Sequence, residues 1–375
     1  MNLMHEVIVV GGGVIGLAVA REIAKDRSVL LLDRANVGEG TSWAAAGMLS
    51  PQSEADADGP FFQLSMASLK MYRRFAEDLR AETGIDPEYD ELGLMVLAST
   101  QEEFQPLQAR AAWQHLAGLP AEILSPDQVL ALEPHITLPL IGALHFPGDP
   151  QVVPRKLVGA LAESCRLRGV EIRTGVQVDE VMYAKGRVSG VRSEGEVFNG
   201  NAVVVCTGVW SDKLLGLSPG IPVHPRKGQI LSLQSGGSAF RRMIRHGSTY
   251  IVPRRGGELV IGATNEAAGF DRSLTPGGIG RLLNEAQAMS SLISGYAIHE
   301  MWTGLRPATA DGLPVIGTSH LEGLLYATGH YRNGVLLAPV TATVMAALVM
   351  GKAAPFALHD FRPDRFVQQA AKPAE

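Results

Sequence analysis

A glycine-rich turn near the start of the chain has residue types and a spacing suited to binding a dinucleotide. Gly11, Gly13 and Gly16 fill the pattern G-x-G-x-x-G, and the turn lies between a β-branched run and a helical segment, as the pattern requires. Glycine at these positions permits a tight turn, lets a pyrophosphate reach the backbone and lets helix pack on strand. Asp33 ends the next apolar run, where a carboxylate accepts hydrogen bonds from a ribose diol. Asp33 disfavours a 2′-phosphate, although Arg34 beside it keeps NADP open.

Two further segments suit a bound cofactor. Thr207 and Gly208 end a buried strand, a place where backbone can pass under a ligand. Residues 41–48 are mostly small, so a helix N-terminus could approach a pyrophosphate and a flat ring, and the hydroxyls of Thr41 and Ser42 can donate to phosphate. A plain helix cap with alanines packed in a core is the alternative for this run.

Length and composition describe a folded protein of two or three domains. The chain has 375 residues, 46% of them apolar and 19% charged, which provides a large core and excludes wholesale disorder. Its net charge of −5 argues against a nucleic-acid coat or a polybasic membrane anchor. We find no secretory leader and no long uninterrupted apolar run, so a cytoplasmic protein without membrane spans is expected. Cys165 and Cys206 are too few for a disulfide framework and lack metal-ligand spacing, so no metal site is expected.

The order of the expected elements predicts an α/β fold, α+β overall, in which one domain interrupts another. A Rossmann-like domain with a parallel sheet is expected to collect residues 1–85, 150–218 and 300–375. A mainly antiparallel domain is expected to collect residues 86–149 and 219–299.

The pattern of apolar residues also predicts individual elements. Residues 61–83 and 335–349 are expected to be helices, because their apolar residues recur at helical spacing or fill the segment. The strand-like runs 229–234, 249–253 and 258–262 are expected to form an antiparallel meander.

Seven motifs along the chain, in this order, resemble the FAD-dependent D-amino acid oxidase family, and within it the glycine oxidases of bacterial thiamine biosynthesis. They are G-G-G-x-I-G (11–16), T-S-x-A-A-A-G-M-L (41–49), T-G-V-W-S (207–211), Y-I-V-P-R (250–254), G-A-T (262–264), W-x-G-L-R-P (302–307) and G-H-Y-R-N-G-x-L-L-A-P (329–339). The first motif is generic to the superfamily, whereas the last three set the subfamily.

The resemblance implies non-covalent FAD bound across the parallel domain. The implied cofactor-binding residues are Gly11, Gly13, Val14, Ile15 and Gly16 at the pyrophosphate turn, Asp33 and Arg34 at the ribose, Thr41, Ser42, Ala46, Gly47 and Met48 along the phosphates and flavin, Val176 at the adenine, Thr207 and Gly208 under the cofactor, and His330, Tyr331, Arg332, Asn333, Gly334, Val335 and Leu336 at the pyrimidine end. The last group has a physical reason, because the helix that begins near Asn333 directs its positive end at the charge of reduced flavin. Buried positions for both cysteines argue against a covalent cysteinyl flavin.

The resemblance also implies a carboxylate-binding site beside the flavin. Arg306 is the expected anchor, since a guanidinium binds a carboxylate bidentately and keeps its charge. Tyr250 is expected to donate a phenolic hydrogen bond to the same carboxylate, and Arg332 and Met48 to complete the pocket. Without the resemblance, an arginine before a proline would be interpreted as a solvated loop residue.

Two residues depart from the glycine oxidase pattern. Asn265 follows G-A-T where methionine is usual, and Ser248 stands where histidine is common. On a strand, His246, Ser248 and Tyr250 share a face, so the polar lining is altered. Asn265 is therefore included among the substrate-binding residues, and the preference among glycine, sarcosine and small D-amino acids stays open.

The implied activity is oxidative deamination of glycine or a similar small amine acid. O2 would be the electron acceptor, the products would be glyoxylate or another 2-oxo acid, ammonia and H2O2, and the imine would supply thiamine thiazole synthesis. No acid or base residue is required, because the cofactor supplies the chemistry. A D-amino acid dehydrogenase that reduces a quinone and a non-catalytic flavin- or NAD-binding regulatory module are the alternatives. Relatives of this family are often homotetramers, so a homotetramer is expected.

Overall fold

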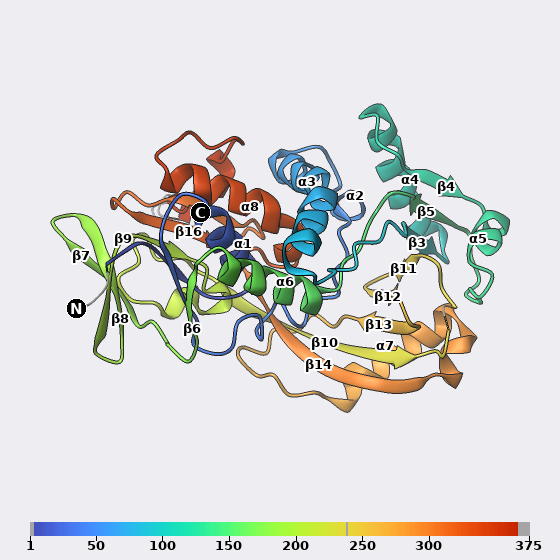
Figure 1. The fold of residues 1–375 in the computed structure, drawn as a ribbon. Coiled ribbons are helices and arrows are strands. Elements are labelled where there is room, and N and C mark those ends of the chain that lie inside the picture. The colour runs from blue at the N-terminus through green and yellow to red at the C-terminus, as the bar shows by residue number, and fades with distance from the viewer. Residues whose placement is uncertain (1–3, 238, 367–375) are drawn as a thin grey trace, which may run out of the picture.

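The chain folds around two β-sheets, each flanked by helices (Figure 1). The computed structural model describes residues 4–237 and 239–366. Within this part of the chain each sheet has eight strands, and strands distant in the sequence are neighbours in both. One sheet is largely parallel and the other largely antiparallel, so the predicted α/β fold is confirmed.

The first sheet has the strand order β15-β16-β9-β1-β2-β6, and β7 and β8 extend from β9. Its strands are β1 (His5–Val10), β2 (Val29–Leu32), β6 (Glu171–Arg173), β7 (Glu180–Ala184), β8 (Arg187–Ser193), β9 (Glu196–Val205), β15 (Val315–Thr318) and β16 (Leu324–Thr328). The strand β1 pairs in parallel with β2 and β9, and β9 pairs in parallel with β16. These central strands are continuous apolar runs because both faces of a parallel sheet are covered.

Alternate residues of β1 pack into two different cores. Val7 and Val9 lie under a layer of helices, whereas Ile8 and Val10 face the opposite side, where β7 and β8 pack. The helices of the first layer are α1 (Val14–Ile23), α3 (Pro60–Thr83), α6 (Pro154–Leu167) and α8 (Gly334–Val349). Two of them, α3 and α8, confirm the helices predicted from apolar spacing.

The second sheet has the order β14-β10-β13-β12-β11-β3-β5-β4. Its strands are β3 (Leu94–Ala98), β4 (Glu122–Leu124), β5 (Gly142–Phe146), β10 (His224–Gln234), β11 (Met243–His246), β12 (Thr249–Pro253), β13 (Glu258–Gly262) and β14 (Ala297–Ala308). The three runs predicted to form a meander are the strands β10, β12 and β13, and they are antiparallel neighbours. The prediction is wrong in one respect, because a further strand, β11, lies between β10 and β12 in the sequence. After β10 the chain crosses to β11, and two hairpins then return β12 and β13 to the edge of β10.

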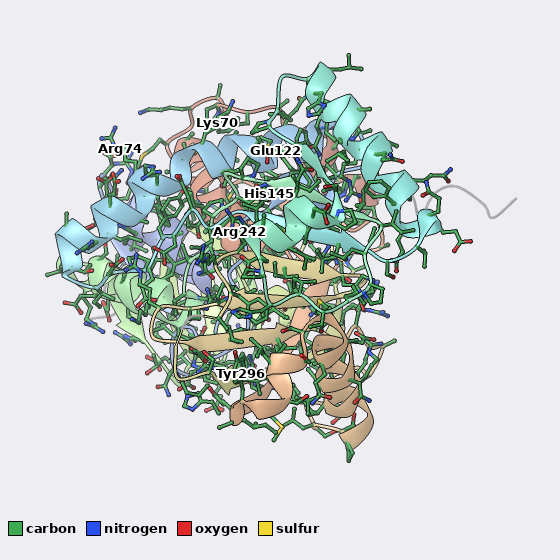
Figure 2. The ribbon with its side chains drawn as sticks, turned by 90° about the vertical axis from the view of Figure 1, so that its right-hand side faces the viewer. Lys70, Arg74, Glu122, His145, Arg242 and Tyr296 are labelled. Carbon is green, nitrogen blue, oxygen red and sulfur yellow. The ribbon has the colours of Figure 1, made fainter. Side chains whose placement is uncertain are left out.

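The two faces of the second sheet have different partners. One face packs on α7 (Pro276–Met289), through Leu282, Ala286 and Met289. The other face contains Ile230 and Val252 and packs against the segment of residues 41–48. At the far edge, Glu122 of β4 pairs with His145 of β5 at 2.9 Å (Figure 2). Only the face that meets residues 41–48 can therefore contribute to a site shared with the first sheet.

The remaining helices are short or lie at the periphery of the second sheet. They are α2 (Pro51–Glu54), α4 (Gln101–Leu116), α5 (Pro126–Leu132) and the 3-10 turns Gly208–Lys213, Ser291–Gly295 and His359–Phe361. None of the described helices combines the length and the apolar character needed to cross a membrane.

The division into domains stays a prediction. Strand β14 runs across the expected boundary at residue 300 and pairs with β10 along its length, so it lies in the second sheet. The final part of the expected first domain, residues 367–375, lies outside the described residues.

Helix α8 contains Pro339, and two side chains of α3 compensate for the hydrogen bonds that the proline removes. Proline has no N–H with which to reach the carbonyl four residues before it, which is that of Val335. The hydroxyl of Tyr72 donates to this carbonyl at 3.0 Å. One residue further on, the Ser68 hydroxyl donates to the Leu336 carbonyl at 2.6 Å and accepts from Val340 N–H at 3.3 Å. The first turns of α8 are therefore hydrogen-bonded to α3.

Removing the Tyr72 hydroxyl should destabilise the protein. Tyr72→Phe leaves the buried Val335 carbonyl without its donor, which costs about 1–3 kcal/mol. Urea unfolding followed by circular dichroism measures the difference. The matched control is Tyr89→Phe, whose hydroxyl bonds the exposed Glu91 and whose loss should change stability by less than about 0.5 kcal/mol. Equal effects of the two substitutions would contradict this account of α8.

Candidate functional site

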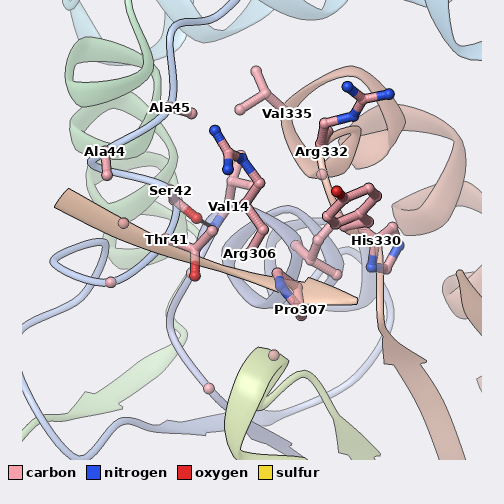
Figure 3. Close-up of a pocket in the computed structure, with 18 of the residues that line it drawn as sticks. Val14, Thr41, Ser42, Ala44, Ala45, Arg306, Pro307, His330, Arg332 and Val335 are labelled. Carbon is pink, nitrogen blue, oxygen red and sulfur yellow. Dashed lines mark hydrogen bonds between the residues drawn. The ribbon is translucent and has the colours of Figure 1, made fainter. Parts of the chain in front are cut away.

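A cavity of about 780 Å³ lies between the two sheets, and most of the predicted residues line it. Its wall includes Gly11, Gly13, Val14, Ile15, Asp33, Arg34, Thr41, Ser42, Ala46, Gly47, Met48, Val176, Thr207, Gly208, Tyr250, Asn265, Arg306 and His330 to Val335. Figure 3 shows the Arg306 side chain between Thr41 and Ser42 on one side and His330 and Arg332 on the other. The other two predicted residues lie behind this wall, since Gly16 packs on Gly11 and Leu336 is buried within α8.

The turn between β1 and α1 can only be built with glycine at two of its positions. Gly11 has φ of +107°, and a Cβ there would lie 2.5 Å from the carbonyl oxygen of Cys206, the residue that follows β9. A Cβ at Gly16 would lie 1.8 Å from the Gly11 carbonyl oxygen. The backbone of the turn is thus pressed against both β9 and α1, and the N-terminus of α1 opens into the cavity.

Asp33 ties the end of β2 to this turn. One carboxylate oxygen accepts from Gly12 N–H at 2.5 Å and the other accepts from Ala35 N–H at 2.8 Å. Burial raises the pKa of Asp33, and these two backbone hydrogen bonds oppose the rise. Its carbonyl accepts from Val176 N–H at 2.9 Å, so Val176 is brought beside Asp33 at the same end of the cavity. This is the arrangement expected where an adenosine is held.

Arg34 and Trp210 form the outer wall at this end. The Arg34 guanidinium lies 3.6 Å from the centre of the Trp210 ring, a cation–π contact. Trp210 belongs to the motif T-G-V-W-S, yet the sequence analysis gave it no role. Both residues line the cavity, so a planar base would meet flat partners here.

The segment of residues 41–48 reaches the turn through Ser42. The Ser42 hydroxyl accepts from Val14 N–H at 2.9 Å and keeps its own proton for another acceptor. Thr41 differs from its prediction, because its hydroxyl donates to the Leu305 carbonyl of β14 in this structure. Of the two hydroxyls expected to donate to phosphate, only that of Ser42 donates to none of the described residues.

Arg254 holds the same segment from the second sheet. Its guanidinium donates to the carbonyls of Ala46 and Val152 and to the side chain of Gln151. Burial lowers the pKa of Arg254 to about 10, which leaves it charged at neutral pH. Trp302 adds a second hydrogen bond to the segment, because its indole N–H donates to the Ala44 carbonyl at 3.1 Å. Arg254 lies in the motif Y-I-V-P-R, and its place there was the signal that the sequence analysis did not use.

His330 fixes the start of α8. Its Nε2 lies 3.1 Å from the Thr341 hydroxyl, and burial lowers the pKa of His330 to about 3. The ring is therefore neutral at physiological pH. Tyr331 N–H donates to the Pro307 carbonyl at 3.0 Å, which joins the loop before α8 to the strand that bears Arg306.

Arg306 and Tyr250 lie flat over two glycines in adjacent strands. A Cβ at Gly228 would lie 2.4 Å from Nη2 of Arg306, and a Cβ at Gly262 would lie 2.5 Å from the Tyr250 hydroxyl. Any side chain at either glycine would lift the group above it. We call Gly228 and Gly262, with the two groups lying on them, the glycine shelf.

The polar groups of the glycine shelf are available to a ligand. Nη1 of Arg306 donates to the Thr264 carbonyl at 2.9 Å, whereas Nη2 makes no hydrogen bond with the described residues. Burial lowers the pKa of Arg306 and raises that of Tyr250, so the phenol keeps its proton. A fixed cation and a neutral O–H donor side by side can bind a carboxylate.

Arg332 and Asn265 border the glycine shelf. Arg332 is half-exposed, and its guanidinium lies 3.6 Å from Glu54. The Asn265 side chain donates to the Tyr331 hydroxyl at 3.1 Å and accepts from Nε of Arg226, also at 3.1 Å. Ser248 is exposed on the cavity wall, so the altered lining predicted from the sequence is polar and open.

Comparison with known proteins decides the family. A family model described as FAD dependent oxidoreductase matches residues 6–348. The chain belongs to this family. FAD is accordingly its cofactor, and the narrow glycine turn, the helix N-terminus facing the cavity and the unused Ser42 proton fit an anionic pyrophosphate.

Two glycine oxidase matches and one bifunctional relative are informative about this oxidoreductase. Glycine oxidase of Geobacillus kaustophilus is 36% identical over 376 residues, which cover 98% of each chain. A crystal structure of that glycine oxidase matches with a TM-score of 0.93 at 35% identity, covering 96% of this chain and 99% of the other. The bifunctional protein ThiO/ThiG of Synechocystis is 33% identical over the whole of this chain, which spans only 56% of that relative's length. An L-proline dehydrogenase from P. horikoshii, at 20% identity and a TM-score of 0.87, shares the fold.

Arg254→Met should weaken FAD binding. The substitution removes the hydrogen bonds from Arg254 to the Ala46 and Val152 carbonyls. The segment of residues 41–48 is then no longer fixed in the position that binds FAD. We expect at least a tenfold rise in the dissociation constant, equivalent to about 1.4 kcal/mol. Flavin fluorescence during titration of the apoprotein measures it. Arg255→Met is the matched control, since Arg255 pairs with Asp86 and Asp90 at the surface, and the same loss of FAD in both variants would contradict the assignment.

Acid should destabilise the fold through His330. The unfolded chain protonates this imidazole below its ordinary pKa of 6.5, but the folded chain does so only near pH 3. The stabilisation is complete above pH 6.5 and is lost as the pH falls towards 3, at up to about 1.4 kcal/mol per pH unit. Urea unfolding at pH 7, 6 and 5 gives the free energy of unfolding at each pH. This free energy should depend less steeply on pH in His330→Gln than in the wild type. His115→Gln, which changes an exposed histidine, should keep the wild-type slope, and equal slopes in all three proteins would refute the role of His330.

Proposed function

We propose that this FAD-dependent oxidoreductase oxidises glycine, and with it sarcosine or small D-amino acids, and reduces O2. The glycine shelf supports the proposal, because Arg306 and Tyr250 present a carboxylate site on the wall of a cavity that also holds the dinucleotide turn. The glycine oxidase relatives, similar over nearly the whole chain, support the same substrate class.

In this proposal the protein works by position and charge. Arg306 and Tyr250 bind the substrate carboxylate, and Arg332 and Met48 close the pocket around it. FAD, when bound, accepts the two electrons of the Cα–H bond. His330 is neutral and bonded to Thr341, so it holds the start of α8 and does not act as a base. The positive end of α8 opens into the cavity, where it would stabilise the negative charge that a bound flavin acquires on reduction.

The overall reaction needs only the amino acid, O2 and water. The amine loses two electrons and two protons and becomes an imine, and O2 gains both and becomes H2O2. Water hydrolyses the imine to glyoxylate, or another 2-oxo acid, and ammonia. We propose that the imine serves thiazole formation in thiamine biosynthesis, as the family resemblance implies, and the relatives named bifunctional protein ThiO/ThiG support this link.

Location and assembly belong to the same proposal. We place the protein in the cytoplasm as a homotetramer, in line with the family resemblance, and with neither nucleic acid nor membrane as a partner. Light scattering of the FAD-loaded protein tests the assembly directly.

Arg306→Ala should raise KM for glycine and leave the flavin bound. Hydrogen bonds to a charged group contribute about 1.5–3 kcal/mol, so we expect a rise of roughly 10- to 100-fold. Peroxide release at varied glycine concentration measures it, and the absorbance of bound flavin verifies loading. Arg306→Lys keeps the charge but not the planar guanidinium, so its KM for glycine should lie between those of the wild type and Arg306→Ala.

Two outcomes would count against the proposal. Unchanged glycine kinetics in Arg306→Ala would remove the arginine from the site. Glycine-dependent flavin reduction without peroxide in air would favour a dehydrogenase that passes electrons to a quinone.

A further inference from the structure

A second arginine, Arg245, lies on the same sheet face as Tyr250 and one strand further from Arg306. Arg245 of β11 is the direct antiparallel partner of Tyr250 of β12, and Tyr250 is in turn the partner of Gly262. Directly opposed residues project to the same face with Cβ atoms about 5 Å apart. Arg245 and Tyr250 both line the cavity, so the row of the glycine shelf continues into a further cationic position.

Arg245 is short of partners for its charge. Nη2 donates to the Ser53 carbonyl at 3.2 Å, and Nε is buried without a hydrogen bond to any described residue. The two arginines closest in charge to Arg245 each have an acidic partner, because Arg110 pairs with Asp56 and Arg332 with Glu54. Within the described chain no carboxylate lies within 4 Å of the Arg245 guanidinium.

Burial lowers the pKa of Arg245, and the charges of Glu54 and Asp149 oppose this without either carboxylate pairing with the guanidinium. Glu54 is shared by Arg332 at 3.6 Å and by the Asn333 amide at 3.4 Å. Asp149 is buried, and burial raises its pKa to about 8, so it is mostly uncharged at pH 7. A buried cation without a directly paired carboxylate is unfavourable, and an anionic ligand in the cavity would relieve that cost.

We propose that Arg245 forms a second anion subsite beside the glycine shelf, so that the site accepts small amino acids bearing a second acidic group. This inference rests on the proposed amine oxidation and names a substrate class for it. Arg306 and Tyr250 hold the first carboxylate, and Arg245 holds the second on the far side of Tyr250, along the same face of the sheet. The second acid can be carried by the nitrogen, as in iminodiacetate, or by Cα, as in D-aspartate.

Non-oxidisable ligands test the subsite independently of turnover. Succinate and butyrate have the same carbon chain and differ in one carboxylate, and each is titrated against the FAD-loaded protein while the flavin spectrum is recorded. At constant ionic strength and pH 7.5, succinate should bind at least tenfold more tightly than butyrate. In Arg245→Met this ratio should fall to about one to two, and in Arg245→Lys it should lie between.

Arg241→Met is the matched control. Arg241 is exposed, lies four residues earlier and precedes β11, so its replacement removes the same net charge without touching the cavity. It should keep the succinate-to-butyrate ratio of the wild type. A ratio near one in the wild type, or a ratio that survives Arg245→Met, would overturn the subsite. The wild-type measurement decides alone if the Arg245 variants do not fold.

Turnover then assigns the position of the second acid. Peroxide release is compared for iminodiacetate against sarcosine and for D-aspartate against D-alanine, and the pair in which the diacid has the higher kcat/KM identifies the attachment point. If glycine is oxidised and both diacids are poorer than their monoacid partners, the substrate class is wrong while the proposed oxidation stands. If glycine itself fails to reduce the flavin, the proposed oxidation is wrong, and the succinate titration still reports on Arg245.

Discussion

The site depends on one constraint, which is that the segment of residues 41–48 is hydrogen-bonded to both sheets. The Ser42 hydroxyl accepts a hydrogen bond from the first turn of α1. From the second sheet, Arg254 donates to the Ala46 carbonyl and Trp302 to the Ala44 carbonyl. A shift between the sheets would break these contacts. Hydride transfer needs reacting atoms within about 3.5 Å of each other. The segment therefore fixes the distance between the dinucleotide turn and the substrate-binding residues of the second sheet.

In the substrate-binding wall, two glycines determine where the side chains that bind the substrate lie. Gly228 and Gly262 leave space into which the flat groups of Arg306 and Tyr250 settle, so the sheet backbone limits their positions. Burial keeps the phenol protonated and intensifies the field of the guanidinium, because little water screens it. An orienting site of this kind suits a reaction whose electronic work is done by the cofactor.

The sequence predicts the fold class and most of the cavity wall, because these depend on local patterns. A short stretch of sequence is enough to recognise each of three features: the glycine turn, the acid at the end of β2 and the apolar helix α8. Contacts between distant segments are not. Strand β11 is too short to be recognised, and Arg254 looks like any arginine after a proline until Ala46, more than 200 residues earlier, is brought beside it. The engagement of Thr41 by Leu305 also depends on how the two sheets meet.

The dependence of α8 on α3 has a consequence for how the holoprotein is made. Ser68 and Tyr72 leave the ribosome more than 260 residues before the carbonyls of Val335 and Leu336 that they complete. The glycine turn is likewise pressed against Cys206, which is synthesised long after it. A nascent polypeptide therefore has no finished pocket to load until α8 has been synthesised, and flavin capture must follow that point.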